Sequence, residues 1–256
     1  MSIHPEDHRG QPDGGMAALA ERLCNAPLQL RGRLPWSSNA TFLVEVEPGP
    51  PGPGEGPGAS ELLAVYKPEA GERPLWDFPA GLWRREVAAY ELSEHLGWHL
   101  VPPTVSRRDG PLGAGSVQLW VEADFEQHYF TLLEDPATHA ALRRMALFDV
   151  VANNADRKAG HCLHGPGGRI WGIDHGVCFH AAPKLRTVIW DFAGEAIEPE
   201  LIEDLTPLSR GELPAGLELL LDDEEVRAVV HRARGLCRRR LYPAPTGEFP
   251  YPWPLI

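Results

Sequence analysis

Cysteine is scarce in this sequence, and long apolar runs are missing. The four cysteines are widely spaced and form no Cys-x-x-Cys pair: Cys24, Cys162, Cys178 and Cys237. We therefore expect reduced thiols rather than a disulfide framework. No stretch reaches the roughly 20 apolar residues that a membrane-spanning helix needs. Residues 1–15 are polar and lack the apolar region of a secretory signal. These features predict a cytoplasmic chain with no stable membrane insertion.

Positive charge is also in deficit. The 256 residues include 24 lysines and arginines against 36 aspartates and glutamates, which gives a formal net charge of −12. Nucleic acids and anionic membranes attract proteins through a positive surface potential. We therefore expect no nucleic-acid partner and no general affinity for anionic membranes.

Glycine and proline, by contrast, are abundant, with 26 of each, but they are concentrated in two segments. Residues 48–58 are glycine and proline apart from Glu55. We interpret this tract as a long hairpin loop, which is tolerable because the entropy cost of closing a loop grows only logarithmically with its length. Residues 243–256 form a Pro-rich tail. With 43% hydrophobic residues overall, the rest of the chain can bury a core.

Hydrophobic periodicity predicts an α+β chain of two lobes joined near residues 120–126. A short helix at 16–25 precedes three strands of an antiparallel meander, and a helix and a further strand complete the first lobe. The three strands are expected at 28–34, 41–47 and 61–68, the helix at 83–96 and the further strand at 116–124. The second lobe should be mostly helical, with a buried helix that begins at Asp135-Pro136, a hairpin over 161–174, a short helix at 200–205 and a final helix that ends near Arg240. We set the boundaries at 1–25 for the tail and first helix, 26–122 and 123–242 for the lobes, and 243–256 for the Pro-rich tail.

Four segments carry residue types that phosphoryl transfer requires. The reaction needs hydrogen-bond donors and a cation around the phosphates, a carboxylate for a divalent metal, and a residue that orients the acceptor. Ser37, Ser38 and Asn39 lie between the first two strands, Lys67 is near the end of the third, and Glu86 is in the following helix. The fourth segment, 153–176, contains Asp156, His161 and Asp174.

The predicted hairpin brings Asp156 and Asp174 together, because they flank its two ends. His161 lies at the start of the first hairpin strand and can face the same space. Asp174 follows the apolar residues of a strand, where a carboxylate is costly without a partner or a metal.

Structural roles compete with these assignments. Lys67 alone is typical of a strand end before a proline turn, and Glu86 could be a solvated helix acid. Asp156 lies in an Asn-Asn-Ala-Asp sequence that is typical of turns. A zinc site is disfavoured, since His161 and His164 are three apart on a presumed strand and point to opposite faces.

Two motifs are similar to those of a known kinase family. Asn-Ala-Asp-Arg at 154–157, followed by Ile-Asp-His-Gly at 173–176, resembles the phosphatidylinositol 3-/4-kinase-like branch of the protein-kinase-like superfamily. The segments Ala-Val-Tyr-Lys-Pro at 64–68 and Arg-Glu-Val-Ala-Ala-Tyr at 85–90 also resemble that branch, especially the type II phosphatidylinositol 4-kinases. Over residues 26–241 the chain resembles actinobacterial proteins of this fold.

The resemblance implies a two-lobed protein-kinase-like fold, with a small antiparallel-sheet N-lobe and a mostly helical C-lobe. It also implies a phosphotransferase that uses ATP with Mg²⁺ or Mn²⁺ and acts on a hydroxyl substrate. Lys67 would contact the phosphates and pair with Glu86, and Asp156 would orient or deprotonate the acceptor. Asp174 would hold the metal. Residues 37–39 would surround the phosphates, and adenine would bind to the backbone near Leu119 and Val121.

His161 departs from the family pattern, which has an asparagine metal ligand at this position. An imidazole is a poorer ligand for Mg²⁺ than a carboxamide oxygen and suits Mn²⁺ better. The departure leaves open a pseudokinase that binds nucleotide without turnover, and a protein AMP-transferase is a further alternative. We rank a soluble acceptor above a phosphoinositide, because Lys184 and Arg186 are the only cations between Asp174 and Asp191.

Overall fold

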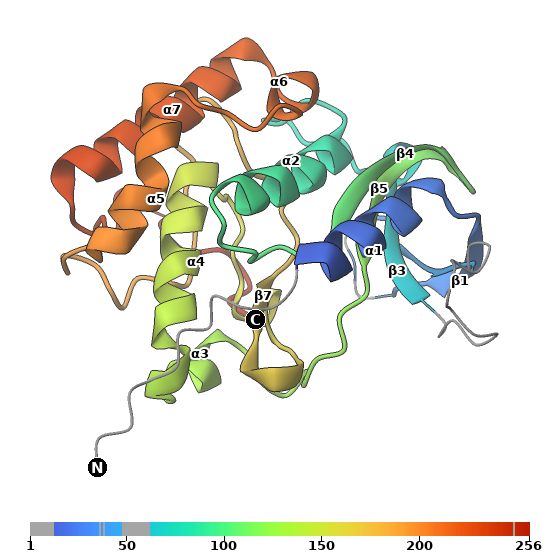
Figure 1. Cartoon of the computed structure of the whole chain (residues 1–256), viewed down its shortest axis with the longest axis horizontal. Helices are drawn as coiled ribbons and strands as arrows, with labels where there is room; N and C mark the ends of the chain where they lie inside the picture. Colours follow the sequence, from blue (N-terminus) through green and yellow to red (C-terminus); the bar gives the residue numbers. More distant parts are fainter. Residues whose placement is uncertain (1–12, 36, 38, 48–61, 248) are drawn as a thin grey trace.

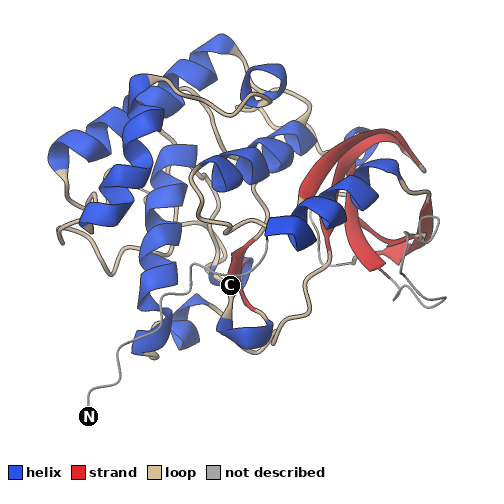
Figure 2. Ribbon diagram, viewed as in Figure 1, coloured by secondary structure: helices blue, strands red, loops and turns tan. Residues whose placement is uncertain are grey.

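The computed structural model describes residues 13–35, 37, 39–47, 62–247 and 249–256. It has a lobe built on an antiparallel sheet and a larger helical lobe (Figures 1 and 2). The predicted Pro/Gly loop at 48–58 lies outside the described residues. Within the described part of the chain, no helix is both long and apolar enough to cross a membrane.

The sheet of the first lobe has the strand order β1-β2-β3-β5-β4, with every neighbouring pair antiparallel. The strands are β1 (Leu28–Arg33), β2 (Phe42–Val46), β3 (Leu62–Pro68), β4 (Thr104–Gly110) and β5 (Gly113–Leu119). The three-strand meander is therefore confirmed, and Val46 opposite Leu62 sets the register of the β2–β3 pair. The expected strand at 116–124 was wrong in its extent, since it begins at Gly113 and ends at Leu119. Its hairpin partner β4 was not anticipated.

Helix α1 (Asp13–Asn25) packs against β4 and β5. Its buried Leu23 joins a small core with the inward side chains of the sheet, among them Val44, Tyr66 and Val117. The Arg107 guanidinium on β4 donates to the carbonyl oxygens of Leu23 and Ala26, at 2.9 and 2.8 Å. A cation at this end of a helix satisfies unpaired carbonyl groups and complements the helix dipole. The first helix is thus fastened to the sheet.

Helix α2 (Leu82–His95) lies between the sheet and the helical lobe (Figure 1). It contacts β4 and β5 on one side and α6 on the other. The Glu72 carboxylate accepts hydrogen bonds from the backbone N–H groups of Gly81 and Trp83, at 2.9 and 2.8 Å, and so satisfies the start of the helix. The sequence expectation of a helix over 83–96 is confirmed within one residue at each end.

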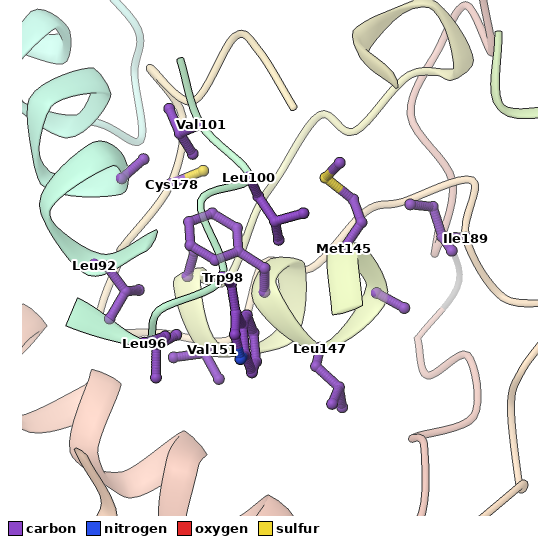
Figure 3. Packing of buried hydrophobic residues seen from close by; sticks show 14 of the residues in the cluster. Leu92, Leu96, Trp98, Leu100, Val101, Met145, Leu147, Val151, Cys178 and Ile189 are labelled. Atoms are coloured by element: carbon purple, nitrogen blue, oxygen red, sulfur yellow. The ribbon is translucent and has the colours of Figure 1, made fainter. Parts of the chain in front are cut away.

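The helical lobe is organised around the buried helix α4 (His139–Ala152). Its apolar residues pack against the end of α2 and the segment that follows it, as Figure 3 shows for Met145, Leu147, Val151, Leu92 and Trp98. The other helices are α3 (Tyr129–Leu132), α5 (Pro199–Arg210), α6 (Leu217–Leu220) and α7 (Asp223–Arg239), with single 3-10 turns at Glu69–Gly71, Pro136–Thr138, Ala159–His161 and Pro166–Gly168. The expected hairpin is present as β6 (Cys162–His164) and β7 (Ile170–Gly172). Helix α5 is longer than the predicted 200–205.

Gly115 lies where β5 passes close to the end of β3. A methyl group added there would sit 2.4 Å from the Lys67 carbonyl oxygen and 2.8 Å from the Pro68 Cα, both backbone atoms. We therefore expect Gly115→Ala to lower the free energy of unfolding by about 1–3 kcal/mol, as overpacking does in well-packed regions, measured by urea denaturation. Gly32→Ala is the matched control, because a methyl group there meets nothing within 4 Å. Equal stability of the two variants would contradict this packing.

Candidate active site

Lys67, Glu86 and Asp174 come from three separate elements and meet in one ionic cluster. Lys67 is near the end of β3, Glu86 is on α2, and Asp174 follows β7, which lies near the centre of the molecule (Figure 1). The Lys67 ammonium forms ion pairs with the Glu86 carboxylate and, at 2.8 Å, with Asp174 Oδ1. The second Glu86 oxygen accepts a hydrogen bond from the His175 backbone N–H at 2.9 Å. Glu86 therefore ties both the sheet and the segment after β7 to α2.

Lys67 and Asp174 each stabilise the charged form of the other. The Lys67 ammonium holds the pKa of Asp174 well below its ordinary value. Burial by itself would lower the pKa of Lys67, but the Asp174 and Glu86 carboxylates outweigh it and raise that pKa. Burial raises the pKa of Glu86, against the opposing effect of Lys67. Near neutral pH the cluster therefore holds a fixed ammonium next to an ionised Asp174, whose side chain is 48% exposed and open to a ligand.

The backbone at Asp174 is unusual. Its φ of 60° lies in the left-handed region, which costs a residue other than glycine about 1–3 kcal/mol. Contacts on both sides hold it in place: the Ile173 carbonyl accepts a hydrogen bond from Arg157 at 2.8 Å, and the His175 N–H donates to Glu86. The conformation turns the chain directly after β7 and leaves the carboxylate facing Lys67.

A buried ion pair supports the loop that contains Asp156, residues 153–161, which we call the Asp156 loop. Arg157 and Asp149 are both fully buried, and the guanidinium donates to the carboxylate at 2.9–3.1 Å. Arg157 also lies 2.7 Å from His175 Nε2. The Asn154 carboxamide donates to Asp149 at 3.0 Å and accepts from the Asp156 N–H at 3.0 Å. The loop and the segment after β7 therefore share one hydrogen-bond network.

Asp149 and the role of Arg157 were missed in the sequence reasoning. Asp149 interrupts the apolar stretch Met145–Ala152 of α4. A carboxylate in a buried helix requires a partner, and this signal could have pointed to the arginine of the Asp-Arg motif.

Asp156 is partly buried and has a basic neighbour. Lys158 Nζ donates to Asp156 Oδ2 at 2.8 Å. Burial raises the pKa of Asp156, and the Lys158 ammonium partly offsets this effect. Lys158 was not singled out from the sequence, although a cation two residues after the key carboxylate is a visible signal. The Asp156 loop therefore presents a carboxylate and an ammonium next to each other.

His161 lies beside Asp174, with 3.5 Å between its Nε2 and Asp174 Oδ2. Burial lowers the pKa of His161 to about 4, so the imidazole is neutral at neutral pH. Over the described ranges, no three His, Cys, Asp or Glu side chains are arranged to hold a metal ion. A pair of ligands still suits a catalytic Mg²⁺ or Mn²⁺, because such ions take one or two protein ligands and complete their coordination with phosphate oxygens and water. Asp174 and His161 are the residues that could hold one.

The residues expected to bind the phosphates and adenine differ in whether their polar groups are free. The Asn39 carboxamide oxygen accepts a hydrogen bond from the Arg73 N–H at 2.9 Å, Ser37 is half-buried, and Ser38 lies outside the described residues. The Leu119 N–H is committed to the Pro103 carbonyl at 2.8 Å. In the part of the chain that the structure describes, neither the N–H nor the C=O of Val121 has a hydrogen-bond partner. Val121 therefore offers both backbone groups that an adenine edge would need.

Comparison with known proteins gives one relative and a set of similar structures. No known family model matches the sequence. Protein Rv2133c of Mycobacterium tuberculosis is 40% identical over 291 aligned residues, which cover 99% of this chain and 97% of that protein. The chain belongs to the family of Protein Rv2133c.

Several solved structures, one of them a kinase, share the fold of this chain. The Golgi casein kinase with Mn and ADP bound has a TM-score of 0.58 and 13% identity, over 91% of this chain and 77% of that chain. Hydra Fam20 with sugar has a TM-score of 0.56 and 12% identity, over 90% of each chain. At such identities the likeness concerns the fold alone. The two-lobed α+β protein-kinase-like fold predicted from the sequence is confirmed.

Substitution of Asp149 tests the hydrogen-bond network that joins the Asp156 loop to the segment after β7. We expect Asp149→Asn to lower the free energy of unfolding by about 3–5 kcal/mol, because it leaves a fully buried guanidinium without its counter-charge. Urea denaturation followed by circular dichroism measures the loss. The control is Glu195→Gln, whose carboxylate pairs with Arg143 at the surface and is 49% exposed. Its removal should cost less than about 1 kcal/mol, and a similar loss in the two variants would refute the role of the buried pair.

Proposed function

We propose that this chain is an ATP- and divalent-metal-dependent phosphotransferase that acts on a hydroxyl acceptor. The observation that carries the proposal is the Lys67 ammonium, held between Glu86 and Asp174 where the two lobes meet. An ammonium fixed beside an ionised, half-exposed carboxylate supplies a cation for phosphate oxygens and a ligand for a metal. Phosphoryl transfer depends mainly on such positioning and charge compensation.

Each site residue receives one role in this proposal. Lys67, positioned by Glu86, contacts the nucleotide phosphates. Asp174 and His161 hold Mg²⁺ or Mn²⁺, which when bound neutralises charge on the phosphates. Ser37 and Asn39, between β1 and β2, line the phosphates, and Ser38, the third residue expected there, lies outside the described residues. The backbone near Leu119, chiefly that of Val121, receives adenine.

The transfer itself balances without further reactants. The acceptor hydroxyl oxygen forms a bond to the γ-phosphorus of ATP, and the bond from that phosphorus to the bridging oxygen breaks, which releases ADP. The hydroxyl proton passes to the Asp156 carboxylate, whose raised pKa makes it a stronger base than an exposed aspartate. Lys158, at 2.8 Å from Asp156, can contact the phosphoryl group during transfer.

The nature of the acceptor follows from the cations that are left unpaired. Lys184 forms an ion pair with Asp77 at 2.7 Å, and both side chains are only 16% exposed. Arg186 is exposed and has no ion-pair partner among the described residues. A phosphoinositide kinase needs several cations near its acceptor. We therefore propose a soluble acceptor in preference to the phosphatidylinositol suggested by the resemblance.

A nucleotide-binding pseudokinase is the second candidate, and the neutral imidazole at His161 favours it. Stabilisation of the wild-type protein by ATP and Mn²⁺ without ADP formation would select it. A third candidate function is the transfer of AMP to a protein. Mass spectrometry of labelled proteins would separate an AMP adduct from a phosphate adduct.

Substitution of Asp174 tests the proposed turnover. We expect Asp174→Asn to reduce ADP formation from ATP with Mg²⁺ or Mn²⁺ by at least about 100-fold, as loss of a charge-stabilising group at a reaction centre does. The amide retains the shape of the carboxylate, so the fold should persist. ADP release is measured by a coupled assay, and circular dichroism checks the fold.

The matched control is Asp223→Asn, an exposed acid in the first turn of α7. It should leave ADP formation within about twofold of the wild type. Wild-type protein that forms no ADP with any divalent ion would refute the transferase. If it is also not stabilised by ATP in a thermal-shift assay, the pseudokinase is excluded as well.

Substitution of His161 tests the metal preference. We expect His161→Asn to shift the ratio of Mg²⁺- to Mn²⁺-supported turnover towards Mg²⁺ by about tenfold, because a carboxamide oxygen suits the harder ion. ADP release in parallel titrations of the two metals measures this ratio. An unchanged ratio would mean that His161 does not contact the metal.

A further inference from the structure

The C-terminal segment folds back onto the Asp156 loop. The Leu255 carbonyl accepts a hydrogen bond from the Ala159 N–H at 2.7 Å. The Pro250 carbonyl accepts two, from the Thr187 N–H at 3.1 Å and from Trp190 Nε1 at 3.2 Å. In Figure 1 the C-terminus lies near the centre of the view, and the Leu255 contact places it against the Asp156 loop. The segment is therefore anchored at two points, one of them inside the Asp156 loop.

The second anchor, at Thr187, lies on a segment that is hydrogen-bonded to the backbone of the Asp156 loop. The Arg157 N–H donates to the Arg186 carbonyl at 3.0 Å, and the Val188 N–H donates to the Arg157 carbonyl at 3.1 Å. Thr187, between them, forms a parallel bridge with Arg157. Asp156 and Arg186 each come directly before a residue of the Arg157–Thr187 bridge, so the two lie on adjacent segments. Thr187 also donates to the Pro250 carbonyl, which places the C-terminal segment next to this pair of segments.

These three segments line a pocket of about 300 Å³ that is open to solvent on one side. Its lining includes Asp156, Arg186 and the aromatic side chains of Phe249, Tyr251 and Trp253. Those side chains are 75%, 49% and 88% exposed, and over the described ranges none of them packs against another ring. Exposed aromatic side chains around one cavity provide apolar faces for a ligand at a low cost in conformational entropy.

The charges in the cavity are unequal. Asp156 is paired with Lys158 at 2.8 Å. The Arg186 side chain has neither an ion pair nor a hydrogen bond within the described part of the chain, and its charge contributes only weakly, after Lys184, to the lowered pKa of Asp77. A guanidinium of this kind favours a carboxylate or phosphate on the ligand, since it can donate two parallel hydrogen bonds.

We propose that residues 249–256 complete the acceptor site, and that the acceptor is a small ring-containing hydroxyl compound with an anionic group. Its hydroxyl lies at Asp156, its ring packs on the aromatic side chains, and its anionic group pairs with Arg186. This proposal rests on the proposed function. The cavity volume is at the lower end of the range for small-molecule sites, and the anchored segment forms one of its walls, which favours a free small molecule over a peptide or a membrane lipid.

The probe for this site is 4-hydroxybenzoate, which carries a hydroxyl, a ring and a carboxylate. With ADP and Mn²⁺ present, we expect it to bind the full chain in the millimolar range, measured by saturation-transfer NMR. Arg186→Gln and Tyr251→Ala should each weaken binding at least fivefold. The uncharged isostere 4-hydroxybenzamide should also bind at least fivefold more weakly. Arg238→Gln, which removes an exposed arginine at the end of α7, should change nothing.

Absence of probe binding to the wild type overturns the proposal, and so does binding that neither Arg186→Gln nor Tyr251→Ala weakens. A serine-containing peptide or phosphatidylinositol vesicles that stimulate ADP release, while the probe does not compete, would also overturn it. Thermal stabilisation by ATP and Mn²⁺ is recorded for every sample. If ATP and Mn²⁺ stabilise the protein but the probe does not bind, only the acceptor assignment has failed. If ATP and Mn²⁺ do not stabilise the wild-type protein, the proposed function itself is contradicted.

Discussion

Arg157 is fully buried, and its side chain and backbone together contact four separate parts of the helical lobe. It pairs with Asp149 on α4, donates to the Ile173 carbonyl at the end of the hairpin, and contacts the His175 imidazole. Its backbone forms the bridge to Thr187. A charge without solvent is tolerated only where every donor finds an acceptor, so these segments cannot move independently. The positions of Asp156 and Asp174 both depend on this arrangement.

The second constraint joins the lobes. Glu86 on α2 receives the Lys67 ammonium from the sheet and the His175 N–H from the helical lobe. A nearly buried carboxylate with two partners from different lobes fixes their relative position, because loss of either contact would leave the charge poorly compensated. Lys67 then meets Asp174 as a consequence. The ionic cluster is therefore both a structural joint and the centre of the proposed chemistry.

Much of the fold could be predicted from the sequence, and the failures have identifiable causes. Alternating apolar residues marked β2 and β3, and helical periodicity marked α2 and α7. Strand β4, Thr-Val-Ser-Arg-Arg-Asp-Gly, was missed because its polar residues hide the alternation, while Arg107 turns out to cap α1. Among the site residues, Lys67, Glu86, Asp174 and His161 are brought together. Asp149 escaped notice, because its partner is eight residues away and only the folded loop brings them into contact.

The sequence by itself determined the periodic elements, their order and the residue types available for chemistry, since these depend on neighbours within a few positions. Only the tertiary structure decided the pairings between distant residues. The ion pair between Lys67 and Asp174 spans 107 positions, and no local pattern encodes it. The Pro-rich tail is the clearest case: its composition indicates only a chain without regular structure, whereas hydrogen bonds to Ala159 and Thr187 place its aromatic side chains beside Asp156. These hydrogen bonds join backbone groups that are far apart in the sequence, so they form only once the chain has folded.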